Sequence, residues 1–364
     1  MTMIETFIEL IKSALYKEKA VIPENFDWDS ARRVIAAHEL YELTYYGLVN
    51  SGIPVPDWLR QKFFERITVL MALWQKGEEV ISALKELDVE YLPLKGIVIK
   101  DMYPEPYMRH MSDIDILIRE KDYKSKIKPA MLKLGYVEGD ESDHEYVWTK
   151  DGQIIELHKR IIPSYNKDFY GVIGDGWEWI KSDNQYAYLV AHFAKHYRDS
   201  GIGINHFVDL EICRNMSGGK GLKDLHLTEF CDNLNRTLDC WFRGKEYDEI
   251  TRHITERIFG SGEYGNRIIA EKSSSLKQLN AAGGSVGKAR IKRLLRAAFP
   301  SFSAMKKRYK ILKYLPFLLP LLWVWRIICS PFRGNVKKNY ENAKSIKKDD
   351  YRDELKFVGL DYRF

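Results

Sequence analysis

Two aspartates, Asp113 and Asp115, lie on either side of Ile114 in an apolar strand-like segment, DIDILI. Residues i and i+2 of a strand point to the same face, so the two carboxylates share one face, with Cα atoms roughly 7 Å apart. Two carboxylates at such a short distance raise each other's pKa because their negative charges repel, and a divalent cation removes this repulsion. Mg²⁺ typically combines one or two carboxylates with substrate phosphates. The pair therefore indicates a Mg²⁺ or Mn²⁺ site for phosphoryl chemistry, with a solvated strand end as the alternative.

A third acid, Glu156, lies in a later strand-like segment, QIIELHKRI, in which Ile155 and Leu157 point to the opposite face. A glutamate on an otherwise apolar strand needs a partner if it is buried. A metal held by Asp113 and Asp115 would supply that partner. Two metals about 3.5–4 Å apart could then clamp the attacking and leaving oxygens of a phosphoryl transfer.

These acids require a small sheet to position them. Residues 89–165 contain strand-like runs and short helical runs in the order β-α-β-α-β-β-β. Asp151-Gly152 separates the last two strand-like runs, and Asp-Gly in that position is a strong hairpin signal. Pro129 interrupts the longer helical run and is expected to bend or restart it. The sequence therefore predicts an α/β core at residues 89–165.

Helical patterns flank this core on both sides. Residues 1–88 read as an N-terminal helical region and residues 166–270 as a second helical region. Residues 271–290 are polar and rich in Gly and Ser, which predicts a loop or linker. Residues 291–364 form a tail that is basic and apolar by turns.

The most apolar part of that tail is YLPFLLPLLWVWRIICSPF, within residues 314–333. Its longest uninterrupted apolar run, about eleven residues, is shorter than the roughly twenty needed to span a bilayer. Pro316 and Pro320 interrupt it further. Basic residues on both sides allow an interfacial helix on anionic lipid and thus a peripheral membrane contact. A helix packed on the protein core is the alternative, and the sequence favours it.

Composition and other motifs exclude several classes of protein. The four cysteines form no CxxC pair, which argues against a zinc or disulfide framework and favours a reducing cytoplasm. No signal peptide is expected at the N-terminus. GGSVGKAR fails the spacing of a phosphate-binding P-loop, and Phe193 stands where a zinc-binding HExxH motif would need Glu. The basic residues are scattered, so no specific nucleic-acid partner is predicted.

An ordered set of short motifs carries a family resemblance across residues 30 to 330. The segment LPLKGIVIKDMYPEPYMRHMSDIDILI, followed by IIELHKRI, resembles the bacterial nucleotidyltransferase-like family of the DNA polymerase β superfamily, often labelled uncharacterised nucleotidyltransferase. The downstream helical segment AHFAKHYRDSGIGINHFVDLEI is similar too. The matching positions are Leu94-Lys95-Gly96, Tyr103-Pro104, Arg109, Asp113-Ile114-Asp115, Glu156-Leu157-His158, His192, His196 and Asp209.

The resemblance implies an α+β fold with a small, mixed-sheet polymerase β-like core and helical N-terminal and C-terminal parts. It implies Mg²⁺-dependent transfer of a nucleoside monophosphate from an NTP to a hydroxyl or phosphate acceptor. The implied metal ligands and catalytic residues are Asp113, Asp115 and Glu156. The implied nucleotide-binding residues are Lys95, Gly96, Arg109 and Ser112, and the further pocket candidates are His158, His192, His196 and Asp209.

Two positions depart from the superfamily pattern. Lys95-Gly96 stands in place of a Gly-Gly or Gly-Ser turn, and the third acid is Glu156 instead of Asp. A catalytically weak or inactive module that binds a nucleotide or a partner is therefore the alternative function. Lys95 could be a surface turn residue, and Arg109 could be a structural ion-pair partner.

The substrates are only partly specified by these residues. They do not identify the base of the nucleotide, and ATP is taken as the default donor. The acceptor could be a small molecule, a glycan precursor, a protein or an RNA end.

Overall fold

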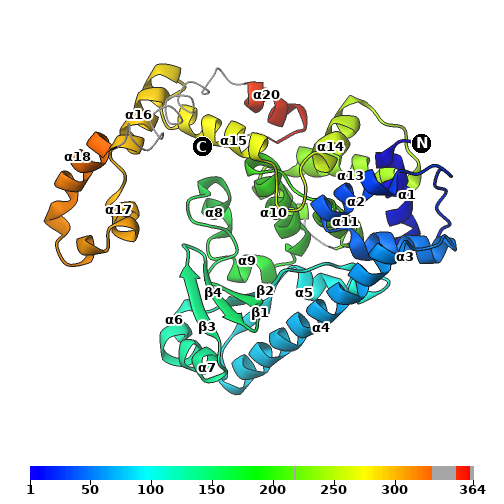
Figure 1. The fold of residues 1–364 in the computed structure, drawn as a ribbon, viewed down its shortest axis with the longest axis horizontal. Helices are drawn as coiled ribbons and strands as arrows, with labels where there is room; N and C mark the ends of the chain where they lie inside the picture. Colours follow the sequence, from blue (N-terminus) through cyan, green and yellow to red (C-terminus); the bar gives the residue numbers. More distant parts are fainter. Residues whose placement is uncertain (217–218, 330–349, 361–364) are drawn as a thin grey trace. The chain divides into compact units, whose positions relative to one another are not determined.

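A computed structural model describes residues 1–216, 219–329 and 350–360 of the 364-residue chain (Figure 1). The chain divides into two compact units. Within the described residues, the first unit comprises 1–266 together with 357–360, and the second comprises 267–329 together with 350–356.

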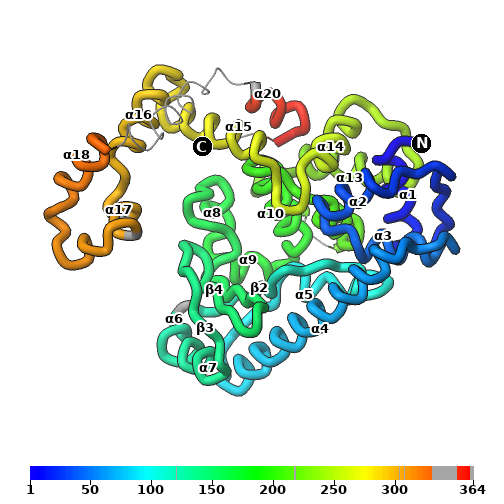
Figure 2. Tube along the Cα trace, in the orientation of Figure 1, coloured from blue at the N-terminus to red at the C-terminus, as the bar shows by residue number. Residues whose placement is uncertain are grey.

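The first unit begins with helices, as the sequence predicts. They are α1 (Met3–Tyr16), α2 (Trp28–His38), α3 (Tyr41–Ser51) and α4 (Asp57–Glu86). Thr2 and Glu5 form a reciprocal capping box that satisfies backbone N–H groups at the start of α1. Tyr16, at the end of α1, packs edge-on against Phe242, and Figures 1 and 2 show α1 beside the helix that carries Phe242. The N-terminal region is thereby joined to the second helical region.

The packing of α1 on α3 depends on a close backbone approach at Gly47. A Cβ atom at this position would overlap the carbonyl oxygen of Leu10, which is backbone and cannot rotate away. Gly47→Ala is therefore expected to lower the free energy of unfolding by roughly 1–3 kcal/mol, as overpacking does elsewhere. Urea denaturation measures this change. The matched control is Gly171→Ala, because Gly171 is also helical but has open space around its Cβ position. Equal stability losses in the two variants would contradict the close approach.

The sheet of the first unit has five strands in the order β1-β2-β5-β4-β3. β2 and β5 are parallel neighbours, and the other pairs are antiparallel, so the sheet is mixed. This confirms the predicted α+β class. The strands are β1 (Tyr91–Pro93), β2 (Asp113–Ile118), β3 (Val137–Glu141), β4 (Glu145–Lys150) and β5 (Gln153–His158). Asp151 and Gly152 both have positive φ and join β4 to β5 as the predicted two-residue hairpin.

Short helices connect these strands. Between β1 and β2 lie α5 (Gly96–Ile99), η1 (Lys100–Met102) and η2 (Pro106–Met108); between β2 and β3 lie α6 (Glu120–Asp122), η3 (Tyr123–Ile127) and α7 (Lys128–Lys133). η3 is a π-helical turn that ends two residues before Pro129, which has no backbone N–H to continue the preceding pattern. The interruption predicted at Pro129 is confirmed.

The second helical region completes the first unit. Its helices are α8 (Lys167–Ile173), α9 (Trp177–Lys181), α10 (Gln185–Asp199), α11 (Ile204–Ile212), α12 (Gly219–Asp224), α13 (Thr228–Arg243) and α14 (Glu249–Phe259). Helices α10 and α11 are packed side by side. They matter most for function, because they carry the histidines described below.

The second unit is helical where the sequence predicts a loop. Its elements are α15 (Arg267–Asn280), α16 (Val286–Ala298), α17 (Phe302–Arg308), η4 (Lys310–Lys313), η5 (Pro316–Leu318), α18 (Leu319–Cys329) and α20 (Asp350–Phe357). The buried positions of α15 (Ile269, Ser273, Leu276 and Leu279) recur every three or four residues. Because one of them is a serine and polar residues surround them, the composition of 271–290 conceals the helical period.

Parts of the predicted tail at 291–364 and of the apolar segment at 314–333 lie outside the described residues. In the part of the chain that the structure describes, no helix combines the length and the apolar character needed to cross a membrane.

Candidate active site

The acidic residues come together because β2 and β5 are parallel and in register. Asp115 lies directly opposite Glu156 on the neighbouring strand, and Asp113 lies opposite Ile154. Parallel strands that are adjacent in a sheet point their paired side chains to the same face. Asp113, Asp115 and Glu156 therefore share one face of the sheet, although about forty residues separate the two strands in the sequence.

The opposite face of these strands belongs to the hydrophobic core. Ile114, Ile116 and Ile155 are almost completely buried in a cluster with residues of α4 and α7. Gly77 lets α4 lie directly on β2, because a Cβ at Gly77 would overlap the end of the Ile114 side chain. Since the isoleucines cannot leave the core, the alternation of the strand directs the aspartates away from it.

The acids form the floor of a cavity of about 400 Å³. Six of the nine histidines of the chain line it, together with both acidic and basic side chains. All lining residues belong to the first unit. They are Lys95, Gly96, Arg109, His110, Met111, Ser112, Asp113, Asp115, His144, Glu145, Glu156, His158, Ile161, Ile162, His192, Lys195, His196, Ser200, His206, Glu263 and Tyr264.

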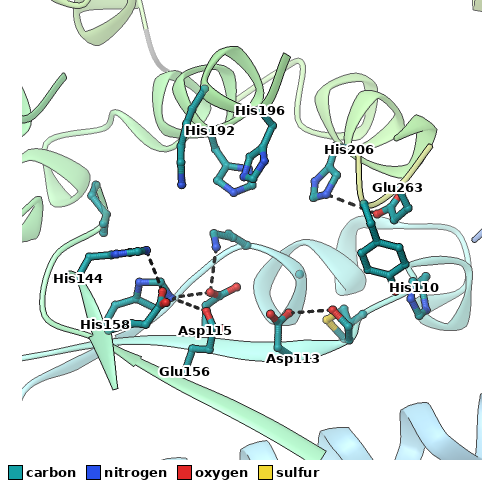
Figure 3. Close-up of a pocket in the computed structure, with 18 of the residues that line it drawn as sticks. His110, Asp113, Asp115, His144, Glu156, His158, His192, His196, His206 and Glu263 are labelled. Atoms are coloured by element: carbon teal, nitrogen blue, oxygen red, sulfur yellow. Dashed lines mark hydrogen bonds and ion pairs between the residues drawn. The ribbon is translucent and has the colours of Figure 1, made fainter. Parts of the chain in front are cut away.

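Asp115 is the centre of the floor and is 5% exposed. Its Oδ1 atom accepts a hydrogen bond from Lys95 Nζ at 2.9 Å and is 2.6 Å from His158 Nε2 (Figure 3). His158 Nε2 is also 3.5 Å from a Glu156 carboxylate oxygen. Asp115, Glu156 and His158 each offer a ligand atom, and these atoms all lie within 4.8 Å of one another. This donor set of two carboxylates and one imidazole fits a divalent cation.

The structure places Asp113 beside this set instead of within it. Ser112 Oγ lies 3.4 Å from an Asp113 carboxylate oxygen. Burial and the neighbouring Asp115 carboxylate raise the pKa of Asp113 to about 6, while Lys95 opposes the rise. Asp113 thus carries the like-charge conflict that the sequence predicts for the pair.

Asp115 avoids that conflict through two cationic neighbours. Burial would raise the pKa of the Asp115 carboxyl, but Lys95 and His158 hold it well below its usual range. The reciprocal effect raises the pKa of His158 to about 9 against burial, through hydrogen bonds to Asp115 and Glu156. His158 Nδ1 is buried and has no hydrogen-bond partner among the residues that the structure describes. Lys95 and His158 therefore supply positive charge at the place where a metal would supply it.

Lys95 reaches Asp115 from an unusual backbone conformation, with φ 49° and ψ −125°. Positive φ with such a ψ favours glycine, and a non-glycine residue held there costs of order 1–3 kcal/mol. The Leu94 N–H donates to the Asp115 carbonyl oxygen at 3.0 Å, which ties the turn to β2. Gly96 follows without room for a side chain, because a Cβ there would press on Met111. The turn at Lys95 and Gly96 therefore holds a costly backbone conformation that directs Lys95 to Asp115, as is typical of functional sites.

Three histidines form the opposite wall of the cavity. His192 and His196 lie one turn apart on α10 with ring centroids 4.5 Å apart, and His206 on α11 is 5.6 Å from His192. Figure 3 shows them directed toward the acidic floor. Burial, reinforced by nearby lysines and histidines, lowers the pKa of His196 to about 3 and lowers those of the other two well below their usual range. The wall is therefore made of neutral imidazoles, each with a donor and an acceptor nitrogen.

Arg109 and Asp209 form a buried pair behind this wall. Arg109 Nε donates to Asp209 Oδ1 at 2.7 Å, Tyr103 donates its hydroxyl to the same oxygen at 2.8 Å, and Arg109 also donates to the His110 carbonyl oxygen. The sequence left open that Arg109 is a structural ion-pair partner, and the family resemblance implied Asp209 as a pocket residue. The structure pairs Arg109 and Asp209 with each other.

Several residues of the cavity are not predicted by any pattern in the sequence. His144, Lys195, His206, Glu263 and Tyr264 all line it. His206 lies fourteen positions after His192 in the sequence, so no short spacing connects them. Glu263 and Tyr264 follow α14 and reach the cavity only through the tertiary fold. The one signal in the sequence is the density of histidine around residues 192–206.

Glu263 gives this cavity a testable pH dependence. Its side chain is 8% exposed, and burial raises the pKa of its carboxyl from 4.5 to about 7. The folded state therefore holds a proton that the unfolded chain releases, and the wild type loses stability as pH rises from 4.5 through about 7. Glu263→Gln cannot take up or release this proton, so its free energy of unfolding is expected to fall by about 2–3 kcal/mol less than that of the wild type over this pH range. Urea denaturation at several pH values measures the difference. Parallel pH curves for variant and wild type would contradict it.

Comparison with known proteins agrees with this geometry. Residues 24–221 match the family described as uncharacterised nucleotidyltransferase, which covers more than half of the chain and includes both acidic strands and the histidines of α10 and α11. A search of curated proteins and a search of solved structures each returned no match. With this match and the acidic cluster on a mixed sheet, the chain belongs to the uncharacterised nucleotidyltransferase family.

Proposed function

We propose that this protein transfers a nucleoside monophosphate from an NTP to a hydroxyl or phosphate acceptor. The observation that carries the proposal is the in-register pairing of Asp115 with Glu156 beside Asp113 and His158 on the floor of one cavity. Nucleotidyltransferases typically use a divalent metal, and this donor set fits one. Family membership supports an NTP as substrate, with ATP as the default donor.

The metal would be held by Asp113, Asp115 and Glu156, with His158 as a further ligand. Bound there, a divalent cation supplies positive charge to the phosphate oxygens as negative charge develops on them. Oxygen ligands suit Mg²⁺, and an imidazole among the ligands suits Mn²⁺ as well. Both ions therefore belong in every assay.

Lys95 and His158 are proposed to exchange partners when substrate binds. Each now contacts Asp115, at 2.9 Å and 2.6 Å. If Asp115 ligated a cation, the Lys95 ammonium would be free to contact a phosphate oxygen, together with the Gly96 amide. The neutral imidazoles of His192, His196 and His206 can donate N–H bonds to the same phosphates from the opposite wall.

The chemical step requires a base for the acceptor. An acceptor oxygen attacks the α-phosphorus, the bond to the pyrophosphate oxygen breaks, and the acceptor proton leaves. Glu156 is the proposed base, since it is less buried than Asp115 and His158, whose ligand atoms lie close to it. Arg109, held by Asp209, is proposed to position the loop before β2 and not to bind phosphate directly.

A binding module without catalysis is the alternative function. One observation favours it: Asp115 is already neutralised by Lys95 and His158, so the folded site does not need a metal for charge balance. Such a module would bind NTP with or without a metal and release no product.

Calorimetry with each of the four NTPs, in Mg²⁺, in Mn²⁺ and in chelator, tests the proposal. We expect saturable binding of at least one NTP that requires the divalent ion, and pyrophosphate release when cell extract supplies acceptors. NTP binding that does not depend on the divalent ion, with no pyrophosphate release under any condition, would support the binding module without catalysis. Absence of binding by all four NTPs would contradict both.

A further inference from the structure

The second unit has an extreme charge bias. Residues 272–329 contain thirteen Lys and Arg residues and no Asp or Glu. Because the whole chain carries a net charge of +6, the remaining residues carry a net charge of −7. The prediction of scattered basic residues is therefore wrong for this segment, where the positive charge of the protein is concentrated, away from the proposed active site in the sequence.

The same segment exposes large apolar side chains. Nearly half of the exposed large hydrophobic residues that the structure describes lie within residues 291–329. Phe317 is 71% exposed and Trp325 is 56% exposed. Soluble monomers rarely leave such groups together without a partner.

Helix α16 shows how charge and apolar surface are arranged. Ile291, Leu294, Leu295 and Ala298 recur at helical spacing and form one stripe, and the three large members are exposed. The buried residue of this helix, Ala289, lies on another side and packs with residues at the end of α15. Lysines and arginines occupy five other positions of the helix: Lys288, Arg290, Lys292, Arg293 and Arg296. Such a pattern is typical of helices that lie in a membrane interface.

Helix α18 is held next to the end of α16, as an ordered part of the same unit. Trp323 Nε1 donates to the Pro300 carbonyl oxygen at 3.0 Å, and Arg326 donates to the Ala297 carbonyl oxygen at 2.9 Å. The Trp323 ring also packs edge-on against Phe299. Yet α18 buries none of its side chains. The contacts fix the helix while Leu321, Val324 and Trp325 stay exposed.

From these observations we infer that the second unit docks on an anionic lipid bilayer, with α16 and α18 lying in the interface (labelled in Figure 1). Branched aliphatic side chains enter the acyl boundary, while the lysines and arginines remain at the headgroups. The docking is peripheral, because no described helix can span a membrane. This inference does not depend on the proposed nucleotidyl transfer.

Other occupants of the surface fit less well. A second copy would bring two strongly positive surfaces together, which like-charge repulsion opposes. A nucleic acid would satisfy the charge but would leave exposed Ile, Leu and Val side chains without a partner, since those side chains neither stack nor hydrogen-bond. Anionic lipid satisfies both properties at once.

Flotation of the full chain with vesicles tests the inference. We expect binding to an equal mixture of phosphatidylcholine and phosphatidylglycerol, and little binding to phosphatidylcholine alone. Ile291→Ser with Leu295→Ser should weaken binding about tenfold through lost apolar contact. Lys292→Glu with Arg296→Glu should weaken it at least about tenfold and reduce its dependence on salt.

Matched variants in the first unit control for general effects. Val69→Ser with Met71→Ser removes two exposed apolar side chains from α4, and Lys124→Glu with Lys133→Glu reverses two exposed charges. Both should bind vesicles like the wild type.

Three outcomes would overturn the inference. The first is no binding to anionic vesicles, or equal losses in the matched controls. The second is a dimer in light scattering that Ile291→Ser with Leu295→Ser dissociates, which would assign the stripe to a second copy. The third is tight binding of single-stranded RNA by a protein that does not bind vesicles.

Discussion

Asp113→Asn is expected to abolish nucleotidyl transfer while leaving the folded protein at least as stable as the wild type. Loss of one carboxylate from the proposed metal site removes several kcal/mol of transition-state stabilisation, which corresponds to a rate loss of about a thousandfold or more. The side chain shape is retained, so the cavity keeps its volume. Pyrophosphate release under saturating NTP and metal measures the effect.

The stability half of this prediction follows from the pKa of Asp113. Burial and Asp115 raise it from 3.8 to about 6, so the ionised carboxylate destabilises the folded state above that pH. Removal of the charge should therefore stabilise the metal-free protein by roughly 1–3 kcal/mol near neutral pH. The gain should shrink as pH falls through about 6, because the wild-type carboxyl is then protonated in the folded state.

Asp140→Asn is the matched control, because Asp140 is an exposed aspartate on β3 outside the cavity. It should keep wild-type turnover and the wild-type dependence of stability on pH. Full turnover by Asp113→Asn would show that Asp113 is not a catalytic residue. Lost turnover with a collapsed fold would contradict the predicted gain in stability.

The second large effect is structural and concerns Asp209. Asp209→Ala leaves Arg109 charged and buried without its partner, and Arg109 is 6% exposed. Removal of one member of a buried pair typically lowers the free energy of unfolding by about 3–5 kcal/mol. Tyr103 loses its acceptor as well, so the upper part of that range is expected. Urea denaturation with metal-free protein measures it.

A double variant distinguishes the effect of leaving one buried charge unpaired from the effect of losing both members of the ion pair. Arg109→Met with Asp209→Leu removes both charges and should recover most of the stability that Asp209→Ala loses. The exposed pair of Lys62 and Glu65 provides the control, and Glu65→Ala should leave stability unchanged within error. A small loss in Asp209→Ala would show that Arg109 is free to serve as a phosphate ligand, as the family resemblance implied.

Much of the core fold follows from local pattern. The alternation in DIDILI determines which face carries the aspartates, and Asp151-Gly152 determines a hairpin whose residues both need positive φ. The period of residues 1–88 predicts helices that the structure contains. Each of these features depends on neighbours within a few residues, which a single sequence displays directly.

The residues of the metal site could be predicted only in part from the sequence. The sequence predicts that Asp115 and Glu156 meet, and they lie directly opposite each other. The trio of close ligand atoms, however, contains His158 in place of Asp113. Register between parallel strands depends on the packing of both strands against α4, and no local motif specifies it.

The opposite wall of the cavity could not be found from the sequence alone. The family resemblance implies His192 and His196, but His206 and Glu263 come from other elements. Likewise, the pairing of Arg109 with Asp209 joins residues 100 positions apart. The pairing is decided by which polar groups the fold buries together, because most buried polar groups are hydrogen-bonded and take their partner from whatever element lies nearest.

Parallel reactions with α-labelled and γ-labelled NTP test the central claim most directly. Each labelled nucleotide is incubated with the wild-type protein, Mg²⁺ or Mn²⁺ and cell extract, and the labelled species are separated. Nucleotidyl transfer predicts that α-label enters an acceptor and γ-label leaves as pyrophosphate, in a reaction that Asp113→Asn abolishes and Asp140→Asn preserves. Transfer of γ-label to the acceptor, or α-label transfer that survives in Asp113→Asn, would contradict the proposed site and its chemistry.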